Sequence, residues 1–253
     1  QTTGLCLFDK VFVPWKHVFL CGEWMHVDHL TKSYATHHRH TCIGARAGFG
    51  DLLIGAGALM IEANGLSMTG NVNLRDTMVE LIKVVEGFYA CGVAASVYGT
   101  EESAGNTMPE PVYANIGKLL LANQIYDMHR LAHTVSGGLI VTLPLPEDDH
   151  NPETGPDLAL VLQGRPDVSY ERRASVARFI EDITATDAGG WMSVISLHGG
   201  GSPEAMKSEI HRRYPIPERR KLVERLIERG VASESSNRST AQQPGQCCDT
   251  GCT

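Results

Sequence analysis

Apolar residues recur at helical spacing through the first half of the chain. The pattern predicts one helix from about residue 34 to 66, in which small residues alternate with large apolar ones. A second helix is expected from about residue 74 to 98, with Asn73 as its N-cap, because an asparagine side chain can accept a hydrogen bond from the first turn. Both helices are long enough to belong to a bundle core.

The second half of the chain continues this helical pattern. A third helix is expected to begin at Pro109 or Pro111 and to stop at the Gly137–Gly138 pair, since proline suits a first turn and glycine suits a helix end. Ser169 is the expected N-cap of a fourth helix that reaches the break at LHGGGSP. Two shorter amphipathic helices follow, in SPEAMKSEIHRRY and PERRKLVERLIERG. The sequence therefore predicts a mostly α protein with four long antiparallel helices.

The two ends of the chain depart from this pattern. LCLFDKVFV, residues 5–13, is rich in aromatic and β-branched residues and is followed by Pro14, which is typical of a strand. A lone strand is not stable, and the rest of the sequence does not visibly supply a sheet for it. At the other end, the polar residues 231–253 predict a disordered tail.

Composition and charge narrow the kinds of partner. The 253 residues carry a formal net charge of -7, which disfavours binding to phosphate backbones or anionic lipid. A small-molecule substrate or a protein partner is therefore expected, rather than nucleic acid or a membrane. No signal peptide and no run of about 18 uncharged apolar residues is visible, from which a cytoplasmic protein is expected. The chain begins with Gln1, so processing, trimming or descent from a longer protein all stay open.

The cysteines do not form the framework of a small secreted protein. Four are scattered along the chain and are expected to be reduced and buried: Cys6, Cys21, Cys42 and Cys91. The other three lie in CCDTGC near the C-terminus, with a spacing that suits zinc or an iron–sulfur site. Because three ligands in a disordered tail do not complete a structural zinc site, inert or oxidisable thiols are expected there.

Titratable side chains gather in HHRHTCIGARAG, residues 37–48. This segment holds His37, His38, His40, Cys42 and Arg46, and its composition is compatible with a metal site, a flavin site or a charged helix start. Histidine, with an ordinary pKa of about 6.5, suits a general base or a metal ligand. A solvated residue at a polar helix start is the simpler alternative, and it must describe at least one of the three histidines.

Four segments, in one order, resemble a known family. LFDKVFVPWKHVF, HHRHTCIGARAGFGDLLIGAG, HTVSGGLIVTLPLPED with NPETG behind it, and LHGGGSPEA resemble the C-terminal half of the flavoproteins that include 4-hydroxyphenylacetate 3-hydroxylase and 4-hydroxybutyryl-CoA dehydratase. The resemblance covers residues 5–230 and implies an acyl-CoA dehydrogenase-like four-helix bundle with additional short helices over residues 31–230. Residues 1–30 would end a middle β-domain, so the missing sheet would belong to sequence outside this chain.

The resemblance also implies a cofactor and an assembly. FAD would lie between the β-domain and the bundles of a homotetramer, or of a complex with a subunit that supplies the N-terminal half. By resemblance the cofactor-binding residues are Arg46, Ser136, Gly137, Gly138, His198 and Gly199. Arg46 would reach the flavin pyrophosphate, because a guanidinium group matches phosphate oxygens in pairs. Its alternative is a surface arginine with a packed stem. Likewise, the glycine motifs serve equally well as ordinary helix ends.

Within the family, HRHTCIGARAGFGD and HGGGSP are closer to the dehydratase, which uses FAD and a 4Fe-4S cluster bound by three cysteines and one histidine. His38 matches the ligand histidine, but Ala45 stands where the ligand cysteine would lie two helical turns later. Cys42 shares a face with His38 and matches a tyrosine believed to be catalytic. Ile195 replaces a catalytic glutamate three positions before His198. The cluster is therefore in doubt, and altered chemistry is expected.

Three functions follow from these observations. The first is part of an FAD-dependent enzyme similar to 4-hydroxybutyryl-CoA dehydratase/vinylacetyl-CoA isomerase, which acts on a small acyl-CoA or related acid with His38 as base and Cys42 beside it. The second is a flavin-dependent hydroxylase of phenolic acids, favoured by Ala45 and opposed by HGGGSP. The third is a non-catalytic helical assembly subunit, favoured by the lost functional groups.

Overall fold

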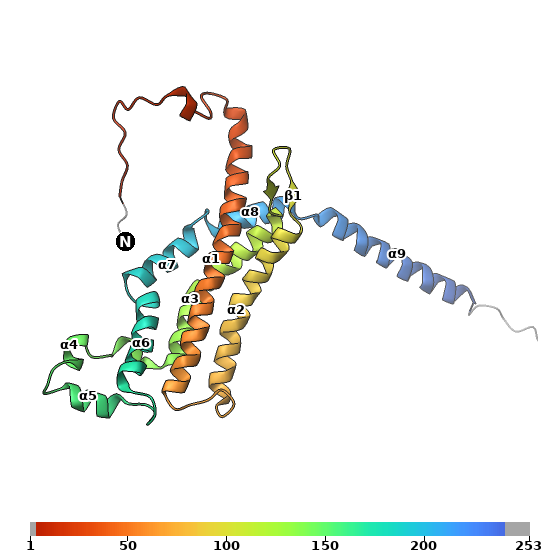
Figure 1. The fold of residues 1–253 in the computed structure, drawn as a ribbon. Coiled ribbons are helices and arrows are strands. Elements are labelled where there is room, and N and C mark those ends of the chain that lie inside the picture. Colours follow the sequence, from red (N-terminus) through yellow and green to blue (C-terminus); the bar gives the residue numbers. More distant parts are fainter. Residues whose placement is uncertain (1–3, 241–253) are drawn as a thin grey trace, which may run out of the picture. The chain divides into compact units, whose positions relative to one another are not determined.

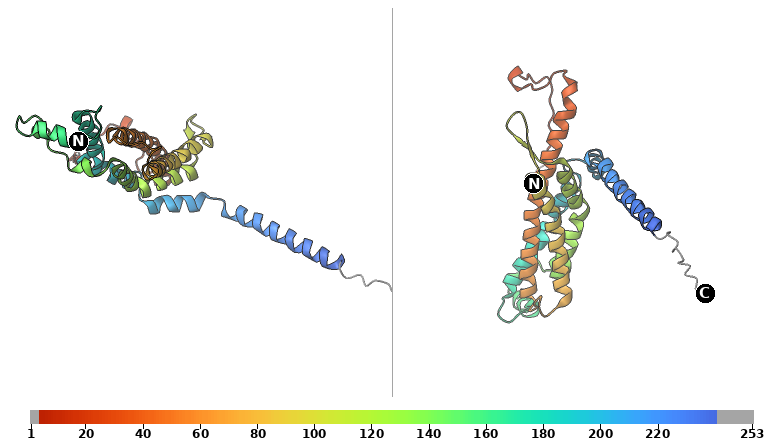
Figure 2. Two further views of the ribbon diagram at one scale, coloured as in Figure 1. Left: turned by 90° about the horizontal axis from the view of Figure 1, so that it is seen from below. Right: turned by 90° about the vertical axis from the view of Figure 1, so that its right-hand side faces the viewer.

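The computed structural model describes residues 4–240, and most of these residues are helical. Three long helices lie side by side (Figure 1): α1 (Val27–Ala63), α2 (Val72–Val97) and α3 (Pro111–Ser136). Two shorter helices complete the bundle, since α6 (Tyr170–Thr184) packs on α1 and α7 (Asp187–His198) packs on α3. Figure 2 shows α1, α2 and α3 side by side from two further directions. The prediction of a mostly α helical bundle is confirmed.

Polar side chains and proline set the starts of these helices. The side chain of Glu110 accepts a hydrogen bond from Tyr113 N, and Pro111 occupies the first turn of α3 as the sequence predicts. Ser169 caps α6 as expected, with its hydroxyl accepting from Arg172 N. The N-cap of α2 is Asn71 rather than Asn73, and its carboxamide oxygen lies 3.2 Å from Leu74 N. The predicted cap was therefore wrong by two positions.

The expected fourth long helix is broken into α6 and α7. Thr186 is extended, and α7 starts again at Asp187, close against the end of α6. A Cβ on Gly189 would lie 2.3 Å from the carbonyl carbon of Thr184 and 2.5 Å from its oxygen, so only glycine permits this approach. The turn redirects the chain so that α6 covers α1 while α7 covers α3.

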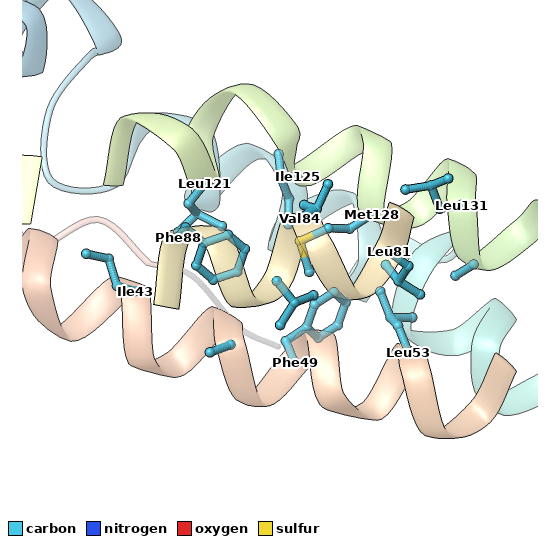
Figure 3. Packing of buried hydrophobic residues seen from close by; sticks show 13 residues of the cluster. Ile43, Phe49, Leu53, Leu81, Val84, Phe88, Leu121, Ile125, Met128 and Leu131 are labelled. Atoms are coloured by element: carbon cyan, nitrogen blue, oxygen red, sulfur yellow. The ribbon is translucent and has the colours of Figure 1, made fainter. Parts of the chain in front are cut away.

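The core lies between α1, α2 and α3. Large apolar side chains from the three helices interdigitate there (Figure 3), including Phe49 and Leu53 of α1, Phe88 of α2, and Ile125 of α3. The helices approach closely at Gly117, where a Cβ would lie 2.5 Å from Ile43 Cδ1. Burial of these side chains accounts for most of the stability of the bundle.

The N-terminal segment does not form the expected strand. Residues 5–13 have no regular structure and leave large side chains such as Leu5, Phe8 and Phe12 exposed. Two short 3₁₀ turns follow, η1 (Trp15–His17) and η2 (Trp24–His26). The physical reason is that no described strand is available to pair with it. The sheet of the described residues is a two-stranded hairpin, β1 (Thr100–Glu101) and β2 (Thr107–Met108), between α2 and α3.

The remaining elements follow α3. They are η3 (Gly138–Val141), α4 (Pro146–Asp149), α5 (Gly155–Leu162), α8 (Pro203–Arg213) and α9 (Ile216–Thr240). The chain divides into two units, residues 1–212 and 213–253. In the second unit, α9 continues past Gly230, where the sequence predicts the start of a tail, as far as Thr240. CCDTGC lies outside the described residues.

Helix α1 has unusual length and apolar content. Among residues 4–240, the segment Trp24–Ala63 is long and apolar enough to cross a membrane by length and composition, with 39% of its most apolar window buried inside the bundle. A helix at the core of a bundle meets the same criterion, and α1 contributes Ile43, Phe49 and Leu53 to that core. Its role in the core accounts for its composition.

Candidate functional site

The three histidines of HHRHTCIGARAG point to different surroundings. His37 is exposed, His38 is half-buried, and His40 turns toward α2, where its Nε2 lies 3.1 Å from Gly92 O and 2.9 Å from Ser96 Oγ. No group of three or more His, Cys, Asp or Glu side chains in residues 4–240 is arranged to hold a metal ion. The composition of this segment therefore does not translate into a three-histidine metal site.

His38 and Cys42 form a pair one helical turn apart. His38 Nδ1 lies 3.5 Å from Cys42 Sγ, within hydrogen-bonding distance for sulfur. The loop that follows α7, residues 199–202, also approaches this nitrogen. Gly200 in this loop has φ +80°, and a Cβ on it would lie 2.8 Å from His38 Nδ1. Because Nδ1 is occupied and crowded, Nε2 is the ring nitrogen left for another partner. Cys42 is half-buried, Cys91 likewise, and Cys6 and Cys21 are exposed, so the expectation of buried cysteines was wrong.

Arg39, the residue after His38 on α1, binds the same loop. It is only 5% exposed, and it donates from Nε to Gly200 O at 2.8 Å and from Nη1 to Asn115 Oδ1 at 2.6 Å. Burial lowers the pKa of Arg39, and the nearby Glu209 carboxylate partly opposes this. Gly201 must also be glycine, since a Cβ there would lie 2.9 Å from Arg39 Nη2 and its φ is +102°. Arg39 therefore fixes the loop against α1.

Two further cations converge on Ser196, in the last turn of α7. Arg46 donates from Nε to Ser196 Oγ at 2.5 Å, and Lys118 donates from Nζ to Ser196 O at 2.5 Å. Lys118 has no exposed surface, and burial lowers its pKa to about 8, partly opposed by the neighbouring Cys42. Burial also lowers the pKa of Arg46. Cations at the C-terminal end of a helix are favoured by its dipole and by its unpaired carbonyls.

These contacts assemble one site from three helices. α1 supplies His38, Arg39, Cys42 and Arg46, α3 supplies Lys118, and the end of α7 with the following loop lies between them. Within residues 4–240, Arg46 and Lys118 form no ion pair with a carboxylate, whereas Arg39 is influenced by the Glu209 carboxylate. The site thus concentrates positive charge around a thiol and an imidazole. Ala45 is exposed and Ile195 is half-buried, and neither side chain carries a titratable group.

His198 and Gly199 lie at the end of α7, beside the first site, whereas the predicted cofactor residues Ser136, Gly137 and Gly138 lie far along α3. Ser136 is buried and donates to Ala132 O, Gly137 has φ +76°, and nothing lies within 4 Å of a Cβ at Gly137 or Gly138. From Lys118 to Gly137 the helix rises by about 28 Å, at 1.5 Å per residue. The sequence-predicted cofactor residues therefore form two separate groups within one chain.

The second group lines a pocket of about 760 Å³, which we call the α3–α7 pocket. It is formed by α3, η3, α7 and the end of α6, and its lining includes Tyr126, His129, Arg130, His133, Gly137 and Ser193. His129 is 6% exposed, its Nδ1 lies 3.3 Å from Ser193 Oγ, and its Nε2 has no hydrogen-bond partner among residues 4–240. Burial, together with the nearby His133, lowers the pKa of His129 to about 4. Burial also lowers the pKa of His133.

The residues present fit a flavin nucleotide better than an iron–sulfur cluster. Among the described residues, the terminal nitrogens of Arg46 have no carboxylate partner, which suits a phosphate oxygen. The separate Gly137–Gly138 turn offers open backbone for the close approach of a ligand, too far from Arg46 for both to hold one phosphate group. A cluster needs several thiolates, whereas the described residues near His38 offer Cys42 alone, with Ala45 at the expected ligand position. Within residues 4–240, the donors near His38 therefore do not make up the ligand set of a cluster by themselves.

The helical fold is that of an acyl-CoA dehydrogenase-like bundle. Residues 27–228 match the family described as 4-hydroxyphenylacetate 3-hydroxylase C terminal, and the chain belongs to this family. It is 32% identical over 232 residues to 4-hydroxybutyryl-CoA dehydratase/vinylacetyl-CoA-Δ-isomerase from Clostridium aminobutyricum, covering 88% of this chain and 47% of the relative. The resemblance seen in the sequence is confirmed.

More distant relatives and solved structures agree with this assignment. The 4-hydroxyphenylacetate 3-monooxygenase oxygenase component of Thermus thermophilus is 25% identical over 215 residues, covering 83% of this chain and 43% of the relative. An oxygen-tolerant archaeal 4-hydroxybutyryl-CoA dehydratase from N. maritimus superposes with a TM-score of 0.83 at 32% identity, covering 88% of this chain and 44% of that one. A 4-hydroxyphenylacetate 3-monooxygenase oxygenase component complexed with FAD and 4-hydroxyphenylacetate has the same fold, with a TM-score of 0.78 at 20% identity, over 90% of this chain and 47% of that one. The chain spans about half the length of these relatives.

Sequence reasoning missed several residues of both sites. Lys118 could have been noticed as a lone cation in the apolar run IGKLLLA, and Arg39 as the neighbour of His38. Ser196 carries no recognisable signal, because a serine in a helix is unremarkable until two cations bind it. His129 and His133 are spaced four residues apart on α3, which places them on one face.

Proposed function

We propose that this chain is the C-terminal portion of an FAD-dependent enzyme of the dehydratase and isomerase kind, acting on a small acyl-CoA or related acid. The observation that carries the proposal is the His38–Cys42 pair, held by the glycine loop so that one imidazole nitrogen is left for substrate. The 32% identity to 4-hydroxybutyryl-CoA dehydratase/vinylacetyl-CoA-Δ-isomerase supports this choice of substrate class.

In this proposal His38 moves a proton. Nε2 takes a proton from the carbon beside the thioester carbonyl and returns it two carbons further along, which shifts a double bond without net gain or loss of atoms or electrons. Cys42, at Nδ1, orients the imidazole ring. Arg46, anchored through Nε to Ser196, would hold a cofactor phosphate with its terminal nitrogens. FAD, when bound, supplies a redox-active ring beside the substrate.

Isomerisation is the preferred reaction because it does not need a cluster. Ala45 and Ile195 stand where the dehydratase-like pattern would place a ligand cysteine and a catalytic glutamate. The remaining groups, an imidazole, a thiol and three cations, suit proton transfer next to a carbonyl. We propose a complete site only in a homotetramer, or in a complex with an N-terminal half, which would also cover the exposed residues 5–19. A cytoplasmic location stays a prediction.

The experiment is an isomerase assay on the protein co-expressed with a chain that supplies the N-terminal half. With vinylacetyl-CoA as substrate, His38→Gln is expected to lower the rate about 100-fold or more, while the flavin absorption bands persist. His37→Gln, an exposed neighbour on the same helix, is the matched control and keeps the wild-type rate. Equal rates for wild type and His38→Gln would contradict the proposed base.

The visible spectrum of the same preparation separates the alternatives. Flavin bands alone support the proposal, and additional broad absorption typical of a 4Fe-4S cluster would mean that the missing half supplies the ligands. A colourless preparation would leave the assembly-subunit function. The second enzymatic candidate, a flavin-dependent hydroxylase, is favoured by Ala45 and by the 25% identical monooxygenase relatives. It predicts oxygen-dependent consumption of reduced FAD with 4-hydroxyphenylacetate and no isomerase activity.

A further inference from the structure

The loop that follows α7, residues 199–202, contains three consecutive glycines. Two of them have φ +80° and +102°, in the region that favours glycine over other residues. The local hydrogen bonds of the loop, from Gly199 N to Ile195 O at 2.8 Å and from Gly201 N to His198 O at 3.1 Å, connect it to the end of α7. Because consecutive glycines have many accessible conformations, the position of this loop relative to α1 needs a bond from outside.

Arg39 supplies that bond. Among the hydrogen bonds of the described residues, one joins the loop to α1, α2 or α3, and it runs from Arg39 Nε to Gly200 O at 2.8 Å. Arg39 Nη1 donates to Asn115 Oδ1 at 2.6 Å, and Asn115 Nδ2 donates to Pro111 O at 2.7 Å. Arg39 and Asn115 are 5% and 1% exposed, so water does not compete for these bonds. A planar guanidinium can make both bonds at once, and Arg39 thereby ties the loop to α3 as well as to α1.

Gly200 lies against both His38 and Arg39. A Cβ on Gly200 would lie 2.8 Å from His38 Nδ1, 3.5 Å from His38 Cε1 and 3.3 Å from Arg39 Cγ. One edge of the His38 imidazole therefore faces the backbone of the residue whose carbonyl oxygen Arg39 binds. The other neighbours of the ring restrain it less, since Cys42 Sγ is 3.5 Å away and the ring of Tyr34, 5.7 Å between centroids, is itself exposed. The orientation of the His38 ring thus depends on the position of the loop.

The stability of the bundle does not require a cation at position 39. Burial of a guanidinium is unfavourable, as the lowered pKa of Arg39 reflects, and the Glu209 carboxylate offsets only part of this effect. A well-packed apolar side chain of similar volume often stabilises a protein as well as a buried ion does. Such a side chain could not bind Gly200 O. The presence of arginine therefore points to a role for the loop, beside the proposed base.

We propose that Arg39 is a positioning residue for His38: by holding Gly200 O, it keeps the imidazole ring in the orientation that presents Nε2 to the substrate. The inference rests on the proposed function, in which His38 is the base. Because Arg39 acts through the loop, its loss is expected to slow proton transfer and to leave substrate binding nearly unchanged.

The test uses Arg39→Met in the protein co-expressed with a chain that supplies the N-terminal half. Methionine keeps an unbranched stem that fills the buried space, and it lacks the N–H groups. With vinylacetyl-CoA as substrate, kcat is expected to fall about 10- to 100-fold while KM changes by less than about twofold, since a displaced base slows the reaction of the bound complex. Arg39→Lys, which keeps the charge and can make one of the two bonds, takes its place where Arg39→Met does not fold, and it is judged by the same split between kcat and KM.

Arg173→Met is the matched control, because Arg173 makes the same kinds of contact away from the site. Its Nε donates to Asn64 Oδ1 at 2.8 Å and its Nη1 donates to Leu162 O, so the control variant loses the same two types of bond. It is expected to keep the wild-type kcat, and thermal unfolding confirms that each variant is folded. An unchanged kcat in the folded Arg39 variant, or an equal loss of kcat in Arg173→Met, would overturn the inference.

The NMR signals of His38 in the 253-residue chain separate this inference from the proposed function. The imidazole signals, assigned by their absence in His38→Gln, should change in Arg39→Met and stay unchanged in Arg173→Met, whether or not the assembled protein is an isomerase. An inactive wild type with this pattern of signals removes the proposed function and leaves the positioning of the ring by Arg39 standing. An active wild type whose kcat and His38 signals are unchanged in Arg39→Met removes only the inference.

Discussion

Acidification should destabilise this protein through His129. The side chain is 6% exposed and its pKa is lowered to about 4 from an ordinary value of 6.5, chiefly by burial, so the folded state resists protonation. Above pH 6.5 the ring is neutral in both the folded and the unfolded state and contributes nothing to the pH dependence. Between pH 6.5 and 4 the unfolded state binds a proton that the folded state does not, so the free energy of unfolding falls as the pH falls.

The magnitude follows from the pKa difference. A shift of about 2.5 pH units at 1.36 kcal/mol per unit corresponds to a loss of about 3 kcal/mol once the pH reaches 4. This loss is roughly a third of the free energy of unfolding of a typical domain, which is about 5–15 kcal/mol. His133, whose pKa burial also lowers, adds to the loss in the same direction.

Urea unfolding followed by circular dichroism measures the effect. Wild type and His129→Gln are compared at pH 7 and pH 4, and wild type is expected to lose about 3 kcal/mol more than the variant, because glutamine does not titrate. Titrations common to both proteins cancel in the difference. His37→Gln serves as the matched control and should follow wild type. Parallel loss in wild type and His129→Gln would refute the reasoning.

Three further results are expected. Burial lowers the pKa of Lys118 from 10.5 to about 8, so between these pH values the unfolded state binds a proton that the folded state does not, and the free energy of unfolding rises with pH. In urea unfolding from pH 8 to 10.5, wild type should gain about 3 kcal/mol relative to Lys118→Met. The same change of the free energy of unfolding with pH in both proteins would contradict this. Gly200 has φ +80°, and a Cβ on it would lie 2.8 Å from His38 Nδ1, so Gly200→Ala should lower the free energy of unfolding by about 1–3 kcal/mol and change the imidazole NMR signals of His38. Gly190→Ala, whose Cβ meets open space, should leave these signals unchanged. Phe88→Ala should lower the free energy of unfolding by about 3–5 kcal/mol because its ring is fully buried, and exposed Val93→Ala on the same helix should change it by less than about 1 kcal/mol.

The spacing of residues along the sequence predicts only part of the site that α1, α3 and the end of α7 form. Spacing along α1 places His38 and Cys42 on one face, and the structure bears this out with the 3.5 Å contact. The same reasoning cannot predict that Lys118, on α3, shares Ser196 with Arg46, on α1, because that contact depends on how three helices pack. It also cannot tell that His40 turns to α2 while His38 faces the glycine loop.

The sequence by itself determined the helical class, the bounds of α3 and the family. These follow from local rules: apolar periodicity, a proline in the first turn, a glycine after the last, and four motifs in order. The break between α6 and α7 was decided only by tertiary structure, because Gly189 matters through its contact with Thr184. The unpaired state of residues 5–13 likewise reflects a missing partner strand, since a strand is stabilised by hydrogen bonds to residues distant in sequence. The contact of Arg39 with Gly200 O depends on how the loop after α7 lies against α1, and only the packed structure determines that.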